Sequence, residues 1–264
     1  HVDGIRIVAP GLGSQIIGNE LFENTAGITI NVSNQTSDTL IQANHAYNNQ
    51  DGIVVSFSST TGNVASVSEN EAHGNTRDGI RVDRNVRVLD NTTYDNGRDG
   101  IGADLGAVIE GNLSHGNLTG IFVNDSNGPS FAIDNTIYDN SFAGIYAVKS
   151  STAIGNRIYN NGVGIRAYSN SGTYSFDGKI QNNIIRDSGT ISIEVRDAGF
   201  GAEISNNTIY EPTANAISMW DGSRDLNLSN NIIWVGGGIA ITASSDSQNG
   251  FVSNYNLIYT PAAG

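Results

Sequence analysis

The chain of 264 residues carries 26 acidic and 13 basic residues, a formal net charge of −13, and no cysteine. So few basic residues cannot line a nucleic-acid backbone, and we therefore expect no nucleic-acid partner. The absence of cysteine excludes disulfides and thiolate zinc sites. The sequence also contains no run of about 18 apolar residues, which a membrane-spanning helix would need.

One phrase repeats along the chain: an Asn, an apolar residue two positions later, an aromatic residue three positions later, and then Gly-Ile. It reads NELFENTAGI from residue 19 to 28, NHAYNNQDGI from 44 to 53, and NRIYNNGVGI from 156 to 165. The Gly position recurs every 20 to 28 residues, at Gly4, Gly27, Gly52, Gly79, Gly100, Gly120, Gly144, Gly164, Ser192, Ala216 and Gly238. Such a period marks supersecondary units that bury their apolar faces by stacking on their neighbours.

Each Gly position opens a short run in which apolar residues alternate with other residues. In chain order the alternating pairs are Ile5 and Ile7, Ile28 and Ile30, Ile53 and Val55, Ile80 and Val82, and Ile121 and Val123. This period of two predicts strands rather than helices. Parallel strands stacked about 4.8 Å apart would form a rod of about eleven rungs and about 50 Å.

The Asn that begins the phrase recurs on every rung. Asn tolerates a left-handed backbone and its amide can bond to the Asn of the next rung, so we expect a structural ladder. The ladder runs through Asn19, Asn44, Asn70, Asn91, Asn112, Asn135, Asn156, Asn183, Asn207, Asn231 and Asn256.

A second column lies three residues beyond each Asn and is mostly aromatic. Its members are Phe22, Tyr47, His73, Tyr94, His115, Tyr138, Tyr159, Arg186, Tyr210, Trp234 and Tyr259. A sugar-binding strip is one interpretation, but a ring on nearly every rung favours stacking that fixes the register. His73 and His115 are two rungs apart, about 10 Å, too far to share one metal ion. With no cysteine and scattered histidines, we expect no zinc or redox-metal site.

The repeated phrase resembles that of the right-handed parallel β-helices of carbohydrate-active proteins, most closely the mannuronan C5-epimerases and related polysaccharide lyases. The resemblance spans residues 1–264 and implies one all-β domain, a right-handed single-stranded parallel β-helix of about 11 rungs. The family's catalytic signature, Asp-Pro-His after Tyr-Gly-Phe, has no counterpart in this sequence, so no catalytic residue is carried over. The repeat reaches both ends without a capping segment, which predicts a domain excised from a larger protein.

Residues two and four positions beyond each Gly point outward by strand parity, and they vary from rung to rung as a ligand-binding face would. Long excursions over residues 56–64 and 168–179, with short turns between them, predict a concave surface. Its expected floor and far wall contain Arg81, Asp83, Asp104, Asn124, Asp125, Tyr146, Lys149, Arg166, Tyr168, Glu194, Arg196 and Trp220.

Asp83 and Asp104 occupy the same slot on successive rungs, which predicts carboxyl groups about 5 Å apart. Three interpretations stay open. The pattern is compatible with solvated carboxylates shielded by Arg81 or Arg84, with oxygen ligands of Ca²⁺ joined by Asn124 or Asp125, and with the acid and base of a retaining glycosidase. Calcium is the one candidate cofactor that the sequence offers.

Lyase or epimerase chemistry needs a neutralised uronate carboxylate and a base near the C5 proton. The candidate catalytic residues are Asp83, Asp104, Tyr146, Lys149, Arg166 and Tyr168, and the candidate substrate-binding residues are Arg81, Glu194, Arg196 and Trp220. Trp220 offers a flat surface for a sugar ring.

The sequence therefore predicts a secreted or cell-surface monomer that binds an acidic polysaccharide and is a candidate lyase or epimerase. The alternatives are a non-catalytic stalk or adhesin segment and a carbohydrate-binding β-helix without turnover. Fold analogy supplies part of this prediction.

Overall fold

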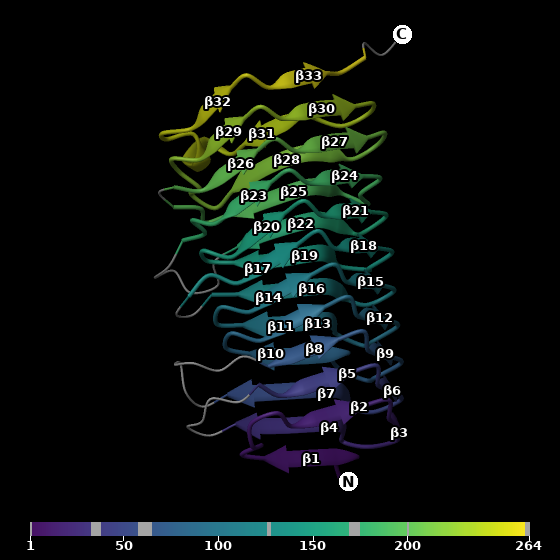
Figure 1. Ribbon diagram of the computed structural model, residues 1–264. Helices are drawn as coiled ribbons and strands as arrows, with labels where there is room; N and C mark the ends of the chain where they lie inside the picture. The colour runs from purple at the N-terminus through teal and green to yellow at the C-terminus, as the bar shows by residue number, and fades with distance from the viewer. Residues whose placement is uncertain are drawn as a thin grey trace.

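Short parallel strands stack into a rod in the computed structural model, with β1 at one end and β33 at the other (Figure 1). The structure describes residues 2–32, 38–57, 65–125, 128–168, 175–199 and 201–261. Each turn of the chain contributes one strand to each of three sheets, and every sheet has eleven parallel strands. The predicted all-β parallel β-helix is therefore confirmed.

The three sheets follow one another in each turn of the chain. The first sheet contains β1 (Ile5–Val8), β4 (Ala26–Val32), β7 (Asp51–Phe57), β10 (Ile80–Asp83), β13 (Asp99–Asp104), β16 (Thr119–Asn124), β19 (Ala143–Val148), β22 (Val163–Tyr168), β25 (Ile191–Arg196), β28 (Asn215–Trp220) and β31 (Ile241–Ala243). The second contains β2 (Gln15–Ile17), β5 (Leu40–Gln42), β8 (Ser66–Ser68), β11 (Arg87–Leu89), β14 (Val108–Glu110), β17 (Phe131–Ile133), β20 (Thr152–Ile154), β23 (Lys179–Gln181), β26 (Glu203–Ser205), β29 (Asn227–Ser229) and β32 (Val252–Asn254). The third contains β3 (Glu20–Phe22), β6 (His45–Tyr47), β9 (Glu71–His73), β12 (Thr92–Tyr94), β15 (Leu113–His115), β18 (Thr136–Tyr138), β21 (Arg157–Tyr159), β24 (Ile184–Arg186), β27 (Thr208–Glu211), β30 (Ile232–Val235) and β33 (Leu257–Tyr259).

Helical structure is minimal in the described part of the chain. One 3-10 turn, η1, spans Ser245–Ser247. None of the described segments forms a helix of the length and apolarity needed to cross a bilayer.

The core is the column of apolar residues that the alternating pattern predicted. Ile53, Ile80 and Ile101 are register partners on neighbouring strands, and all three are fully buried. Because β-branched side chains suit a pleated surface, stacking them rung on rung removes them from water and fixes the register at the same time.

The Asn ladder forms as expected. The side-chain amide of Asn112 donates to Oδ1 of Asn135 on the next rung at 3.0 Å, and also to the carbonyl of Val88 at 2.9 Å. Its Oδ1 in turn accepts the backbone N–H of Asn91 at 2.8 Å. In the middle of the rod these Asn side chains therefore satisfy buried backbone groups at a bend, where strand pairing cannot reach them.

A second ladder lies five residues beyond the first. It runs through Asn24, Asn49, Asn75, Asn96, Asn117, Asn140 and Asn161.

Further along the rod the buried Glu211 accepts the backbone N–H of Ser188 with both carboxylate oxygens, at 3.1 and 3.0 Å. Burial raises the pKa of Glu211, and its bonds to Ser188 and Ser192 oppose that shift.

Short turns follow β10, β13 and β19, as predicted. Arg84, Leu105 and Lys149 take positive φ angles of 47°, 61° and 57° there, which lets the chain reverse within a few residues. The two long excursions expected at 56–64 and 168–179 fall largely outside the described residues.

Candidate functional site

The outward residues of β10 to β28 form one surface, which we call the first-sheet face. Register pairing aligns its first column as Arg81, Gly102, Phe122, Tyr146, Arg166, Glu194 and Ser218. These residues stand two positions beyond the repeated Gly, so the sequence placed this column correctly. It did not reveal which side chains bond to one another.

Asp83 and Asp104 are register partners, as the sequence predicted. Oδ1 of Asp104 accepts a hydrogen bond from Nδ2 of Asn124 on the following rung at 2.7 Å. Burial raises the pKa of Asp83; a hydrogen bond from Ser56 opposes that shift and the nearby charge of Asp104 adds to it. A proton held by Asp83 would suit an acid role, but the assignment of this pair to catalysis stays a prediction.

Asp125 and Lys149 lie in the turns that follow β16 and β19. Oδ1 of Asp125 accepts the backbone N–H of Gly128 at 2.6 Å, so this carboxylate supports its own turn. The carbonyl of Lys149 accepts the backbone N–H of Asp177 at 3.3 Å. A calcium site formed by Asp83, Asp104 and Asp125 stays a prediction, as does a catalytic role for Lys149.

Aromatic rings meet edge to face in the middle of the first-sheet face. The ring of Tyr146 contacts Phe122 at 5.4 Å and 82°, and Phe142 at 6.1 Å and 66°. The guanidinium carbon of Arg166 lies 5.0 Å from the Phe142 ring centre and 5.8 Å from that of Tyr146. Burial raises the pKa of Tyr146, which keeps its phenol protonated at neutral pH.

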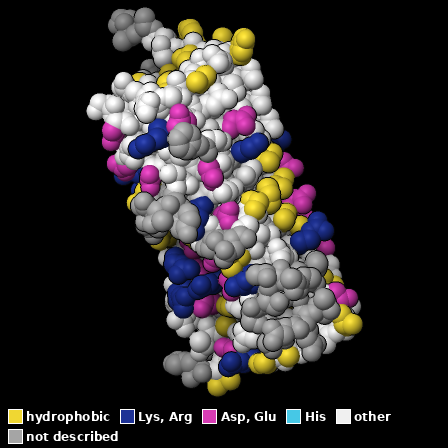
Figure 2. Space-filling view, turned by 90° about the vertical axis from the view of Figure 1, so that its left-hand side faces the viewer, with side chains coloured by type: hydrophobic (Ala, Val, Ile, Leu, Met, Phe, Trp, Pro, Cys, Tyr) yellow, Lys and Arg dark blue, Asp and Glu magenta, His cyan; other side chains and the backbone are white. Residues whose placement is uncertain are grey.

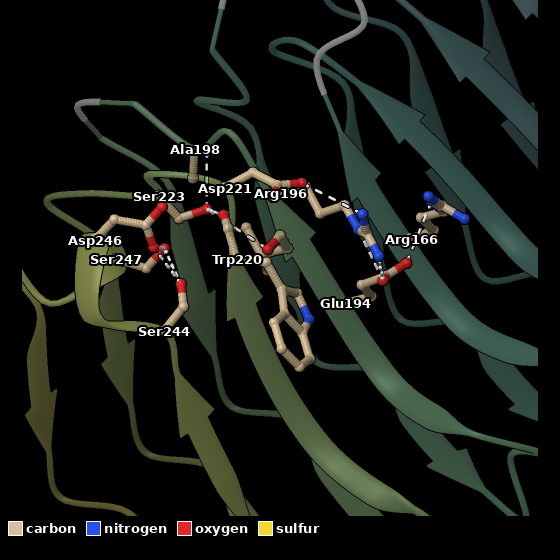
Figure 3. Close-up of polar contacts among 11 residues, drawn as sticks. Arg166, Glu194, Arg196, Ala198, Trp220, Asp221, Ser223, Ser244, Asp246 and Ser247 are labelled. Atoms are coloured by element: carbon tan, nitrogen blue, oxygen red, sulfur yellow. Dashed lines mark hydrogen bonds and ion pairs between the residues drawn. The ribbon is translucent and has the colours of Figure 1, made fainter.

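Glu194 links the two arginines of this face (Figure 3). Oε2 of Glu194 lies 3.2 Å from Nε of Arg166, and Oε1 accepts a hydrogen bond from Nε of Arg196 at 2.8 Å. Arg196 also donates a hydrogen bond from Nη1 to Oδ2 of Asp221 at 3.3 Å. Figure 3 shows the terminal nitrogens of Arg166 directed away from Glu194, where they can meet another acceptor.

Trp220 and Tyr168 lie in the second outward column, both half-buried, with Arg196 between them as register partner of each. The predicted neighbourhood of Tyr168, Arg196 and Trp220 therefore forms. The Nε1 atom of Trp220 is buried without a hydrogen-bond partner among the described residues. Arg166 also lies close to Tyr168, with 5.9 Å between its guanidinium carbon and the ring centre.

Sequence reasoning missed a cluster of buried carboxylates at the start of the first-sheet strands. Asp78 pairs with Arg98 at 2.7 Å, and Arg98 also lies 3.3 Å from Asp99. Burial, together with the charge of Asp78, raises the pKa of Asp99 to about 6. An available signal was the Asp that directly precedes the repeated Gly at residues 51, 78 and 99.

The aromatic column of the third sheet stacks from Phe22 to Tyr159, and again between Tyr210 and Trp234, as predicted. Tyr94 lies parallel to His115 at 5.2 Å, and Tyr138 lies parallel to Tyr159 at 4.9 Å. Rings stacked in this way cover one another on both faces, which fits a structural role. The same sheet also contains a group of three metal-ligand side chains whose ligand atoms lie within 4.8 Å of one another: His45, Glu71 and His73.

The candidate face therefore combines aromatic rings with hydrogen-bonding side chains of both positive and negative charge. Figure 2 shows the side of the rod toward which β4 and β7 point in Figure 1; basic and acidic side chains are interspersed there, with hydrophobic ones gathered near mid-height. Such a mixed surface can hold a polar polymer through ring stacking and charge-assisted hydrogen bonds.

Comparisons with known proteins agree with the fold. The family model described as "Right handed beta helix region" matches residues 57–154 and 149–261. The A-module of the Azotobacter vinelandii mannuronan C-5 epimerase AlgE6 is similar, with a TM-score of 0.67 and 17% identity over 98% of this chain and 84% of that chain. The A-module of the mannuronan C-5 epimerase AlgE4 from the same organism is also similar, with a TM-score of 0.60 and 15% identity over 98% of this chain and 88% of that chain.

A third similar structure is the Streptococcus pneumoniae surface protein and adhesin PfbA, with a TM-score of 0.58 and 13% identity over 96% of this chain and 82% of that chain. A search of curated proteins finds no match. At these identities the similar structures show the parallel β-helix fold and leave the activity open.

Proposed function

Because the chain belongs to the right-handed β-helix family, we propose that it is an extracellular or cell-surface protein that binds an acidic polysaccharide along the first-sheet face. Structures similar to it include epimerase modules that act on mannuronan and a surface adhesin. Both kinds of relative are compatible with a β-helix whose outer surface meets an extended ligand.

The observation that carries this proposal is the arrangement of Arg166 and Tyr146. Glu194 approaches Arg166 at Nε, which leaves the two terminal nitrogens as a fork for a uronate carboxylate. The neighbouring Tyr146 meets Phe122 and Phe142 edge to face. Neither phenylalanine stacks flat on Tyr146, unlike the rings of the third-sheet column, and Tyr146 is half-buried, so part of its ring can pack against a sugar ring.

Binding without turnover is the function that the geometry supports best. Lyase or epimerase chemistry needs a base near the C5 proton, and burial raises the pKa of Tyr146, which disfavours its phenolate. A catalytic role for Asp83, Asp104, Lys149 and Tyr168 remains a hypothesis, which the binding experiment described below also tests. A Ca²⁺ ion at Asp83, Asp104 and Asp125 would assist binding by bridging to uronate carboxylates.

Affinity electrophoresis in gels that contain alginate, pectate or a neutral glucan tests the proposal, with and without Ca²⁺. We expect retardation by the uronates and none by the glucan. Arg166→Lys keeps the charge but loses the two-nitrogen fork, and should weaken binding about tenfold. Tyr146→Ala should weaken it similarly.

Tyr138→Ala is the matched control, because this tyrosine belongs to the third-sheet stack and should leave binding unchanged. Absence of retardation by every uronate polymer would remove the binding function. Formation of unsaturated products or a change in uronate stereochemistry would show turnover and favour an enzyme.

A further inference from the structure

His45, Glu71 and His73 converge on the outer surface of the third sheet, away from the first-sheet face. β6 and β9 are neighbouring parallel strands, with His45 opposite Glu71 and Tyr47 opposite His73 (Figure 1). The outward side chains at either end of these two strands alternate with the buried Ala46 and Ala72. His45 and His73 are therefore diagonal neighbours, close enough for long side chains to touch.

The two imidazoles face each other through the same atom. Nε2 of His45 lies 2.8 Å from Nε2 of His73, so one ring donates a hydrogen bond and the other accepts it. Two imidazole nitrogens on one tetrahedral Zn²⁺ lie about 3.3 Å apart, given Zn–N distances of about 2.0–2.1 Å. The two nitrogens would therefore need to move apart by only about half an ångström to bind one ion together in place of the hydrogen bond between them.

Glu71 completes a three-ligand set. A carboxylate oxygen of Glu71 and one nitrogen of each histidine all lie within 4.8 Å of one another. We propose that His45, Glu71 and His73 bind one divalent transition-metal ion of the Zn²⁺, Ni²⁺ and Cu²⁺ class. Two imidazoles and one carboxylate suit these ions, whereas Ca²⁺ takes six to eight oxygen ligands.

The surroundings hold these side chains in position. The hydroxyl of Tyr94 donates to Oε1 of Glu71 at 2.7 Å, which orients the carboxylate from outside the ligand set. The ring of His73 lies parallel between Tyr47 at 5.4 Å and Tyr94 at 4.5 Å.

An ion at this position would join β6 to β9 and leave coordination positions open to water. Three protein ligands plus water is the arrangement found where a metal stays accessible to other molecules. The metal would also stabilise the rungs near the beginning of the rod, since binding to the folded state alone raises the stability.

Calorimetric titration of chelator-treated protein with ZnCl₂ tests the proposal. We expect one Zn²⁺ per chain, a rise in the melting temperature on binding, and an affinity at least tenfold lower in His45→Gln, His73→Gln and Glu71→Gln. Glu20→Gln is the matched control, because Glu20 accepts the Tyr47 hydroxyl at 2.8 Å just as Glu71 accepts that of Tyr94. His115→Gln removes a stacked histidine that has no second imidazole beside it in the third-sheet column.

Both controls should bind Zn²⁺ with the affinity of the wild-type protein. Electron paramagnetic resonance of the wild-type protein with one equivalent of Cu²⁺ provides a test that needs no variant, and should show coupling to two nitrogen nuclei. Equal Zn²⁺ affinity in the wild type and His73→Gln, or a Cu²⁺ spectrum without nitrogen coupling, would overturn the proposal.

Discussion

Arg196 donates from Nε to Oε1 of Glu194 at 2.8 Å, across two residues of the same strand, β25. The Glu194 side chain is only 5% exposed, and Arg166 approaches its other oxygen from the preceding rung. A carboxylate buried on the outer face of a sheet is stable because two guanidinium groups surround it. This arrangement orders the arginines that the proposed ligand would meet.

The first prediction concerns the Glu194 carboxylate. Glu194→Gln keeps the shape of the side chain but removes its charge, leaving Arg166 and Arg196 without their shared partner. Removing one member of a buried ion pair costs about 3–5 kcal/mol, and partial exposure of the arginines reduces the expected loss here to about 2 kcal/mol. Urea denaturation monitored by circular dichroism measures this loss.

Asp221→Asn is the control for that experiment. Asp221 bonds to the same Arg196, but its side chain is 57% exposed. Solvent screening should therefore limit the change in the free energy of unfolding to about 0.5 kcal/mol. Equal losses in the two variants would show that burial of Glu194 contributes nothing to the strength of its ion pairs.

The second prediction concerns the pH dependence conferred by Asp99. Burial and the charge of Asp78 raise its pKa from the ordinary value of 3.8 to about 6 in the folded protein. Between these two values the folded state binds more protons than the unfolded state, so stability falls as pH rises from about 4 to about 6. The stabilising contribution is complete below pH 4 and absent well above pH 6.

Asp99→Asn should remove this loss. Relative to the wild-type protein, the free energy of unfolding of the variant should rise by about 2 kcal/mol between pH 4 and pH 7. Denaturation midpoints recorded at half-unit steps of pH measure the difference. If the free energies of unfolding of the wild type and the variant change with pH in parallel across this range, the pKa of Asp99 is not raised.

The repeat made the fold predictable, because each rung had to satisfy the same constraints. Alternating Ile and Val residues set the inward columns, and one Asn per rung set the bend, so register pairs such as Asp83 with Asp104 followed directly. The site was less predictable, because its contacts are not periodic. The convergence of Arg166 and Arg196 on Glu194 depends on side-chain directions that strand parity does not specify.

The histidine group shows where column reasoning fell short. Along the aromatic column, His73 and His115 are separated by two rungs, and this separation led to the expectation that no metal site would form. The relevant partner, His45, lies one position after its ladder Asn rather than three, so it belongs to a different outward column on the preceding rung. Reading diagonal neighbours as well as columns would have brought His45, Glu71 and His73 together.

The last prediction compares the middle of the Asn ladder with its end. Asn112→Ala would leave the buried carbonyl of Val88 and the buried N–H of Asn91 without their bonds at 2.9 and 2.8 Å. Each orphaned buried group costs about 1–3 kcal/mol, so we expect a loss of about 3 kcal/mol in the free energy of unfolding. Asn19→Ala removes a side chain at the first rung whose amide bonds to Asn44 at 2.9 Å in a partly exposed position, and should cost about 1 kcal/mol. Chemical denaturation of both variants measures the two losses in the free energy of unfolding. Equal losses at the two positions would show that the contribution of a ladder Asn does not depend on its burial.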